Sequence, residues 1–119
     1  MTLPDVRTAS DVDAGALQRF YADAFPERAA FLNEHWRWLY RVGRFPGIEP
    51  LVLAVGRRVV GHAGAIPLLI SRLGQSAPAI WFVDFSILPE FQGKGGGRAL
   101  TAAWMKMCPD RVTFCNENS

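Results

Sequence analysis

The chain has 119 residues, of which 50% are hydrophobic and 20% charged, with a formal net charge of +2. This length and composition predict one domain, residues 1–119, with a core of its own. The small net charge, without a basic arm or stripe, argues against a nucleic acid partner. With no apolar run of membrane-spanning length and no signal peptide, we expect a cytoplasmic protein without a membrane partner. Cys108 and Cys115 lack metal-type pairing, so we expect no metal.

The N-terminal segment predicts a short strand followed by a helix. Residues 5–9 alternate in polarity, which is typical of a strand. Ser10 is the expected N-cap of the helix, with Asp13 as a weaker form of the capping-box acid. Apolar residues then recur at helical intervals until Pro26, which ends the helix.

A second helix is expected from about Glu27 to Gly43. Its centre is too aromatic for a single apolar stripe, so some of its rings should lie outside the core. Trp38, Tyr40 and His35 are therefore candidates for packing or for a subunit contact.

The middle of the chain predicts a strand hairpin. Residues 51–55 and 59–66 are β-branched and apolar, and the turn between them contains Gly56. Pro67 is expected to interrupt the second strand. The glycines of that strand predict that another group approaches the sheet closely. His62 is expected to be a hydrogen-bonded histidine on the strand, with a proton carrier as the alternative.

The C-terminal part predicts a strand, a loop, a helix and a last strand. Residues 79–87 are aromatic and β-branched, as in a largely buried strand, and a proline follows at position 89. From Gly97 to Met107 apolar residues recur at helical spacing. Residues 111–115 have the composition of one more strand.

The loop between that strand and helix holds four glycines within positions 93–97. Glycines destabilise regular structure by roughly 1 kcal/mol each, so their number here suggests that the backbone itself is used. Successive N–H groups at a helix N-terminus bind anions, and Lys94 and Arg98 add positive charge. These features predict a phosphate or diphosphate site.

Two common phosphate motifs do not fit this loop. A nucleoside-triphosphate loop needs Ser or Thr after its Gly-Lys pair, whereas Gly95 follows Gly93-Lys94. A dinucleotide fingerprint that starts at Gly93 would need a glycine where Arg98 stands.

The pattern Gln92-x-x-Gly95-x-Gly97, after Ile87-x-Pro89, resembles the acetyl-coenzyme A signature of the GCN5-related N-acetyltransferases, the GNAT superfamily. The resemblance implies acetyl-CoA or another acyl-CoA as cosubstrate. The implied coenzyme A residues are Phe85, Ser86 and Ile87 for the thioester and pantetheine arm, and Gln92, Gly93, Lys94, Gly95, Gly96, Gly97 and Arg98 for the diphosphate. Gly96 replaces a usual aliphatic residue, which predicts a looser helix start.

The resemblance also implies an α/β (α+β) fold, with a mixed, mainly antiparallel sheet flanked by helices in the order β-α-α-β-β-β-α-β. The fourth helix and two further strands of the family are not expected in this sequence, which therefore looks like the N-terminal two-thirds of the domain. The implied activity is transfer of an acetyl or other acyl group to an amine of a small molecule or peptide. In the family the first two helices border the acceptor groove, so the resemblance also implies contact of Trp38, Tyr40 or His35 with the acceptor as an alternative to packing.

Catalytic groups are less well defined by the sequence. Relatives place a tyrosine acid on the fourth helix, or a glutamate base on the fourth strand, where this chain has Trp81. The remaining acidic candidates are Asp84, where desolvation in an apolar strand would favour the protonated form, and Glu90 in the loop. Asp84 has the alternative of being a polar residue at a strand bulge that is hydrogen-bonded by the backbone.

Three functions therefore remain open. The first is an acyl-CoA-dependent N-acyltransferase. The second is a non-catalytic module that binds acyl-CoA, suggested by Trp81 and the missing acid. The third is an assembly role, including a homodimer, suggested by the aromatic second helix and the open edge of the last strand.

Overall fold

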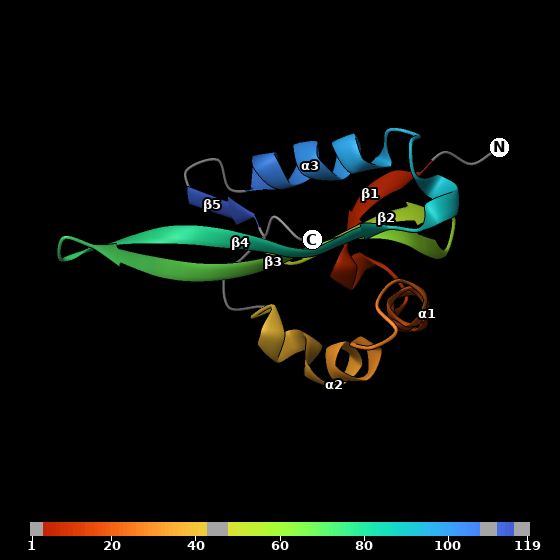
Figure 1. Ribbon diagram of the computed structural model, residues 1–119, viewed down its shortest axis with the longest axis horizontal. Coiled ribbons are helices and arrows are strands. Elements are labelled where there is room, and N and C mark those ends of the chain that lie inside the picture. The colour runs from red at the N-terminus through yellow and green to blue at the C-terminus, as the bar shows by residue number, and fades with distance from the viewer. Residues whose placement is uncertain (1–3, 43–47, 108–111, 116–119) are drawn as a thin grey trace.

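One five-stranded sheet carries helices on both faces (Figure 1). The computed structural model describes residues 4–42, 48–107 and 112–115. The strands are β1 (Asp5–Thr8), β2 (Leu51–Val55), β3 (Arg58–Arg72), β4 (Gln75–Ile87) and β5 (Val112–Cys115). The helices are α1 (Ala14–Ala24), α2 (Ala29–Leu39) and α3 (Gly96–Met107), with 3₁₀ turns η1 (Ala9–Asp11) and η2 (Pro89–Phe91). The predicted order of elements is confirmed.

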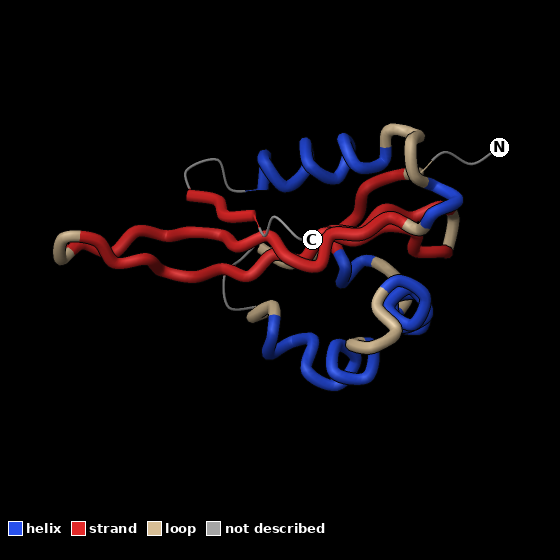
Figure 2. The backbone as a smooth tube through the Cα atoms, viewed as in Figure 1, coloured by secondary structure: helices blue, strands red, loops and turns tan. Residues whose placement is uncertain are grey.

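The sheet follows the order of the chain, β1-β2-β3-β4-β5. Neighbouring strands from β1 to β4 are antiparallel, whereas β5 runs parallel to β4. The long β3–β4 hairpin projects past the helices, and Figure 2 shows its two strands closed by a tight turn. That turn is formed by Leu73 (φ 51°) and Gly74 (φ 79°), and two residues with positive φ give the twist that a two-residue hairpin prefers.

The two faces of the sheet receive different helices. In Figure 1, α3 covers one face, and α1 and α2 cover the other. Because side chains alternate along a strand, Leu53 of β2 packs toward α3, while His62 of β3 meets Tyr21 of α1 and Tyr40, which directly follows α2. Apolar residues from both sides form the core, with Phe20, Leu32 and Leu100 almost fully buried. None of the described helices combines the length and apolar character needed to cross a membrane.

Two helix boundaries differ from the sequence prediction. Ser10 lies in η1 and does not cap α1; the N-cap is Asp13, whose carboxylate accepts a 3.1 Å hydrogen bond from the amide of Ala16. The prediction of Ser10 was wrong because the chain makes a short 3₁₀ turn before the helix starts. Helix α2 ends at Leu39 and Arg41 has a φ of 51°, so the helix stops before Gly43, which lies outside the described residues.

Pro67 does not interrupt its strand. It is buried inside β3 and is paired in register with Ile80 of β4. Proline lacks only the donor N–H, and β2 pairs with β3 no further than Ala63. At Pro67, therefore, the edge of β3 that faces away from β4 has no partner strand among the described residues, and proline is tolerated there.

Candidate active site

A bulge interrupts the pairing of β3 and β4. Gly64 pairs with Val83 and His62 with Ser86, so that Asp84 and Phe85 together oppose the single residue between them on β3. Asp84 has a φ of 55°, in the left-handed region, where a residue other than glycine is destabilised by about 1–3 kcal/mol. Aspartate is among the residues that tolerate this conformation best.

The Asp84 carboxylate is buried and both of its oxygens are bound. Its side chain is 6% exposed. The Tyr40 hydroxyl, just after α2, donates a 2.6 Å hydrogen bond to Oδ2, and the Arg28 guanidinium, just before α2, forms an ion pair with Oδ1. The sequence alternative of a hydrogen-bonded aspartate at a strand bulge is therefore what the structure has, although its partners are side chains rather than backbone.

His62 continues the same polar cluster. Its Nδ1 lies 2.9 Å from the backbone oxygen of Asp84, and its Nε2 lies 2.8 Å from the hydroxyl of Tyr21. The indole Nε1 of Trp36 donates a 3.0 Å hydrogen bond to that hydroxyl. Both ring nitrogens of His62 are bonded, which confirms the expectation of a hydrogen-bonded histidine, and the residue is also fully buried.

Burial sets the protonation of this cluster. It lowers the pKa of His62 to about 4, although the hydrogen bond to the Asp84 carbonyl opposes that shift. It also raises the pKa of Tyr21 and of Tyr40 well above the usual range for tyrosine. His62, Tyr21 and Tyr40 are therefore neutral at neutral pH.

The glycine loop follows directly on β4. The Gln92 side chain donates a 2.8 Å hydrogen bond to the carbonyl of Ile87, which ties the loop to the strand end. Gly93 (φ 76°) and Gly95 (φ 87°) adopt conformations that other residues rarely take. Gly93, Gly95, Gly97 and Arg98 line a hollow of about 470 Å³ at the N-terminus of α3.

Gly96 brings α3 close to the sheet. It is buried, and a Cβ at this position would lie 2.5 Å from Cδ2 of Leu53. Leu53 thus occupies the space that a side chain at position 96 would need. The first turn of α3 therefore packs closely on β2, and the looser helix start expected from the glycine stays a prediction.

One edge of β4 beside this loop carries no strand among the described residues. β5 pairs with Ala79–Phe82, and the pairing does not continue along Val83–Ile87. The predicted thioester and pantetheine residues, Phe85 to Ile87, fall in that stretch. Phe85 also reaches the loop, because its Cζ would lie 3.7 Å from a Cβ placed at Gly97.

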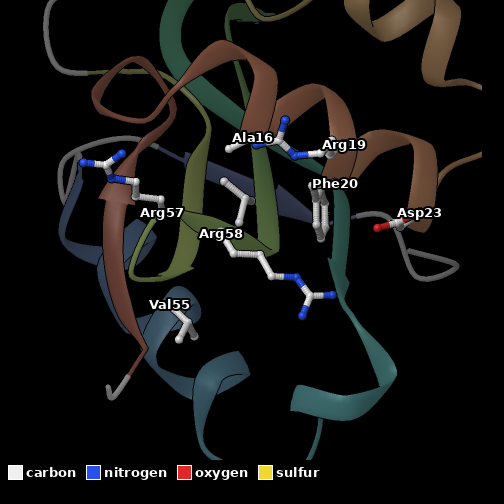
Figure 3. A pocket seen from close by; sticks show the side chains of 8 residues that line it. Ala16, Arg19, Phe20, Asp23, Val55, Arg57 and Arg58 are labelled. Carbon is white, nitrogen blue, oxygen red and sulfur yellow. The ribbon is translucent and has the colours of Figure 1, made fainter. Parts of the chain in front are cut away.

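Positive charge surrounds the loop. The guanidinium of Arg58 and the ammonium of Lys94 lie 5.5 and 5.8 Å from the centre of the Phe91 ring. Arg58 also extends into a pocket of about 400 Å³ that Arg19 and Arg57 line (Figure 3). Asp23 lines the same pocket, and Arg58 lies 3.4 Å from Glu90, so these cations have acidic neighbours.

The structure separates the two acidic candidates. Asp84 lies in the bulge beneath α2, whereas Glu90 is on the surface, with a 58% exposed side chain 3.4 Å from Arg58. Sequence reasoning missed Arg28, Tyr21 and Trp36, which gave no motif signal because they meet Asp84 and His62 only in the folded chain. Within residues 4–42, 48–107 and 112–115, no three His, Cys, Asp or Glu side chains are grouped so as to hold a metal ion.

Comparison with solved structures finds this fold in known proteins. A transcriptional regulator from Bacillus halodurans C-125 aligns with 96% of this chain and 81% of its own, at 13% identity and a TM-score of 0.73. An aminoglycoside N-acetyltransferase in complex with CoA aligns with 98% of this chain and 78% of its own, at 15% identity and a TM-score of 0.69.

A GNAT family acetyltransferase from Staphylococcus aureus aligns with all of this chain and 89% of its own, at 18% identity and a TM-score of 0.68. No protein-family model and no curated protein sequence matches the chain. The chain therefore has the fold of the GCN5-related N-acetyltransferases, a likeness of structure at low sequence identity.

Proposed function

We propose that the protein is an acyl-CoA-dependent N-acyltransferase, which moves an acetyl or other acyl group from a coenzyme A thioester to an amine. The observation that carries this proposal is the position of the glycine loop. It lies at the N-terminus of α3, directly beside the stretch of β4, Val83–Ile87, on which β5 does not pair.

The loop fits a diphosphate in shape and charge. Cβ atoms at Gly93 and Gly95 would have no neighbour within 4 Å, so the chain leaves open space over both residues. The first amides of a helix have no partner within the helix, and the helix dipole favours an anion at that end. Lys94 and Arg98, both exposed, add positive charge at the same place. Residues 92–98 are therefore the proposed diphosphate site.

The free edge of β4 is the proposed place for the thioester. Backbone N–H groups of Phe85 to Ile87 would polarise its carbonyl by hydrogen bonding as negative charge develops on the oxygen. The amine nitrogen attacks that carbon, the carbon–sulfur bond breaks, the amine loses a proton to a base, and the departing thiolate gains one.

Asp84 and Glu90 remain the acidic candidates for the proton transfers. Glu90 is exposed to solvent, and its carboxylate lies 3.4 Å from the guanidinium of Arg58. Asp84 is buried, and its two carboxylate oxygens are bound by Tyr40 and by Arg28.

Titration calorimetry with coenzyme A tests the site. Gly95→Asp places a side chain and a negative charge at a φ of 87°, and we expect it to abolish binding. Gly74→Asp is the matched control, because Gly74 has a φ of 79° and equally open space at the far tip of the β3–β4 hairpin. Loss of binding in both variants, or in neither, would contradict the proposed site.

A thiol-release assay with acetyl-CoA and a panel of small amines and peptides tests the transfer. Release of thiol that depends on the amine is the expected result. Coenzyme A binding without any turnover would instead favour the alternative of a non-catalytic acyl-CoA-binding module.

An assembly role has one observation in its favour. Trp38 and Phe31 of α2 are 73% and 43% exposed, and exposed rings of this size are typical of contact surfaces. Tyr40, in contrast, is buried and packs inside the protein. Light scattering would detect a homodimer, and a monomer at high concentration would contradict this role.

A further inference from the structure

We infer that Arg28, Tyr40 and His62 are positioning residues, which hold the β4 bulge in the one backbone conformation that acyl transfer needs. This inference rests on the proposed function, because it assigns a role to the bulge in that reaction. It goes beyond the coenzyme A loop and gives a task to side chains that contact Asp84 and not the loop: Tyr40 and His62, which are buried, and Arg28, whose side chain is 46% exposed.

The contacts converge on a single strained residue. Tyr40 binds Oδ2 of Asp84 at 2.6 Å, Arg28 binds Oδ1, and His62 lies 2.9 Å from the backbone oxygen. Every oxygen of Asp84 is therefore held, by groups from both ends of α2 and from β3. Such contacts offset the strain of its left-handed φ of 55°.

The donors and acceptors of the cluster have only one consistent arrangement. A carbonyl oxygen cannot donate, so Nδ1 of His62 carries the proton and donates to Asp84. Nε2 of the neutral ring must then accept, and the Tyr21 hydroxyl donates to it. The oxygen of Tyr21 in turn accepts from the indole N–H of Trp36. The chain of donors runs from Trp36 through Tyr21 and His62 to the backbone of Asp84.

This series of hydrogen bonds holds the backbone of Asp84 in place and does not carry protons. The titratable groups that face His62 are Tyr21, Tyr40, Asp84 and Arg28, the first two with raised pKa values and the last two paired with each other. None of His62, Tyr21 and Tyr40 changes charge near neutral pH. The backbone carbonyl of Asp84 also ends the chain, because an amide oxygen does not pass a proton on.

The bulge is the part of β4 whose direction matters for the thioester. A bulge leaves backbone groups outside the regular ladder, and their direction follows from the φ and ψ of the bulged residue. Releasing Asp84 from its partners would let its peptide relax out of the left-handed region. The N–H groups of Phe85 and Ser86 would then turn away from the position of the acyl carbonyl.

Variants that remove one donor at a time test this role. Tyr40→Phe removes one hydroxyl and keeps the ring, and we expect kcat to fall by about tenfold, as for one lost hydrogen bond, with the Kd for coenzyme A within about twofold of wild type. Tyr21→Phe removes the donor that binds His62, and Trp36→Phe removes the donor that binds Tyr21. These donors are two and three hydrogen bonds away from Asp84, so their effects on kcat should be progressively smaller. A purely structural role would lower the folded fraction without this order.

A matched pair at position 62 separates the two ring nitrogens. The amide of His62→Asn can replace the Nδ1 donor to Asp84, whereas His62→Gln places its amide near the position of Nε2. We expect His62→Asn to retain more of kcat than His62→Gln. The reverse order, or equal loss, would contradict a role through the Asp84 carbonyl.

Nuclear magnetic resonance gives a readout that does not need turnover. We expect the ¹⁵N shifts of His62 to show the neutral Nδ1–H form at neutral pH; an Nε2–H form would overturn the chain of donors. We also expect Tyr40→Phe to shift the amide signals of Phe85 and Ser86.

The outcomes distinguish this inference from the proposed function. Folded Tyr40→Phe with unchanged kcat and unchanged amide signals would overturn the inference and leave the acyltransferase intact. A wild-type protein without turnover would overturn the proposed function, and with it the role of the bulge in transfer, while the amide shifts would still decide whether the cluster holds the bulge.

Discussion

Gly64 lies directly beneath the ring of Tyr40. A Cβ at position 64 would come within 2.7 Å of the Tyr40 Cε1 atom and equally close to the backbone oxygen of Val83. The missing side chain lets Tyr40 sit flat enough on β3 to reach Asp84 with its hydroxyl. The absence of a side chain at Gly64 of β3 therefore allows Tyr40 to anchor the bulge on β4.

The first prediction follows from this contact. Gly64→Ala should lower the free energy of unfolding by about 1–3 kcal/mol, because neither an aromatic ring nor a strand carbonyl can yield without repacking. Urea unfolding measures the loss. Gly97→Ala is the control, since its Cβ would meet Ile87 at an ordinary 3.6 Å and should be tolerated. Equal stability of Gly64→Ala and wild type would show that the ring moves away freely.

A second prediction concerns the packing of α3 on β2. Gly96→Ala would bring a Cβ to 2.5 Å from the terminal methyl Cδ2 of Leu53, so we expect a loss of about 1–2 kcal/mol. Leu53→Val shortens the side chain that is in the way. In a double-mutant cycle the two changes should couple, with Leu53→Val recovering part of the loss. If the two changes in unfolding free energy were strictly additive, the loss in Gly96→Ala would not arise from its contact with Leu53.

A third prediction is a pH dependence caused by His62. Burial lowers its pKa from 6.5 to about 4, so between these values the unfolded chain binds a proton that the folded chain does not. The free energy of unfolding should therefore fall as the pH falls from 6.5 toward 4, by about 3 kcal/mol in total from this group. Above pH 6.5 both states are neutral at His62, and its contribution is constant.

Urea unfolding at a series of pH values measures that dependence. Carboxylates also titrate in this range, so the quantity to follow is the difference between wild type and His62→Asn, which should shrink with falling pH. His35→Asn is the control, because His35 has a 42% exposed side chain on the outer face of α2. A constant difference between wild type and His62→Asn would contradict the lowered pKa.

The sequence was sufficient for the order of elements and for the place of the glycine loop between β4 and α3, whereas the binding of coenzyme A there stays a prediction. Both depend on local signals: strand composition, helical spacing and glycines in a short loop, here Gly93 and Gly95 with positive φ. The expectation that glycines on the second hairpin strand allow close approach is also confirmed, by Tyr40 over Gly64. Sequence alone did not say which group would approach.

The polar cluster around Asp84 was beyond the reach of local patterns. Tyr21 and His62 are separated by 41 positions, and Arg28 and Asp84 by 56. Such pairs are set by how α1 and α2 cross the sheet, which periodicity does not fix. Pro67 was misjudged for a related reason, because whether a strand tolerates proline depends on which neighbour lies beside it.

The last prediction concerns the charge at the glycine loop. Lys94→Ala should weaken coenzyme A binding by roughly 3- to 10-fold at low salt, because it removes a cation beside the proposed diphosphate site. Lys106→Ala removes the same charge from the last turn of α3, at the opposite end of the helix, and should have little effect. Raising the salt concentration should reduce the difference between the two variants, since ions screen exposed charges. Calorimetry of both variants, each at two ionic strengths and beside wild type, measures their affinities for coenzyme A. Equal weakening by both substitutions would mean that the helix acts through its overall charge and not through a bound diphosphate at its N-terminus.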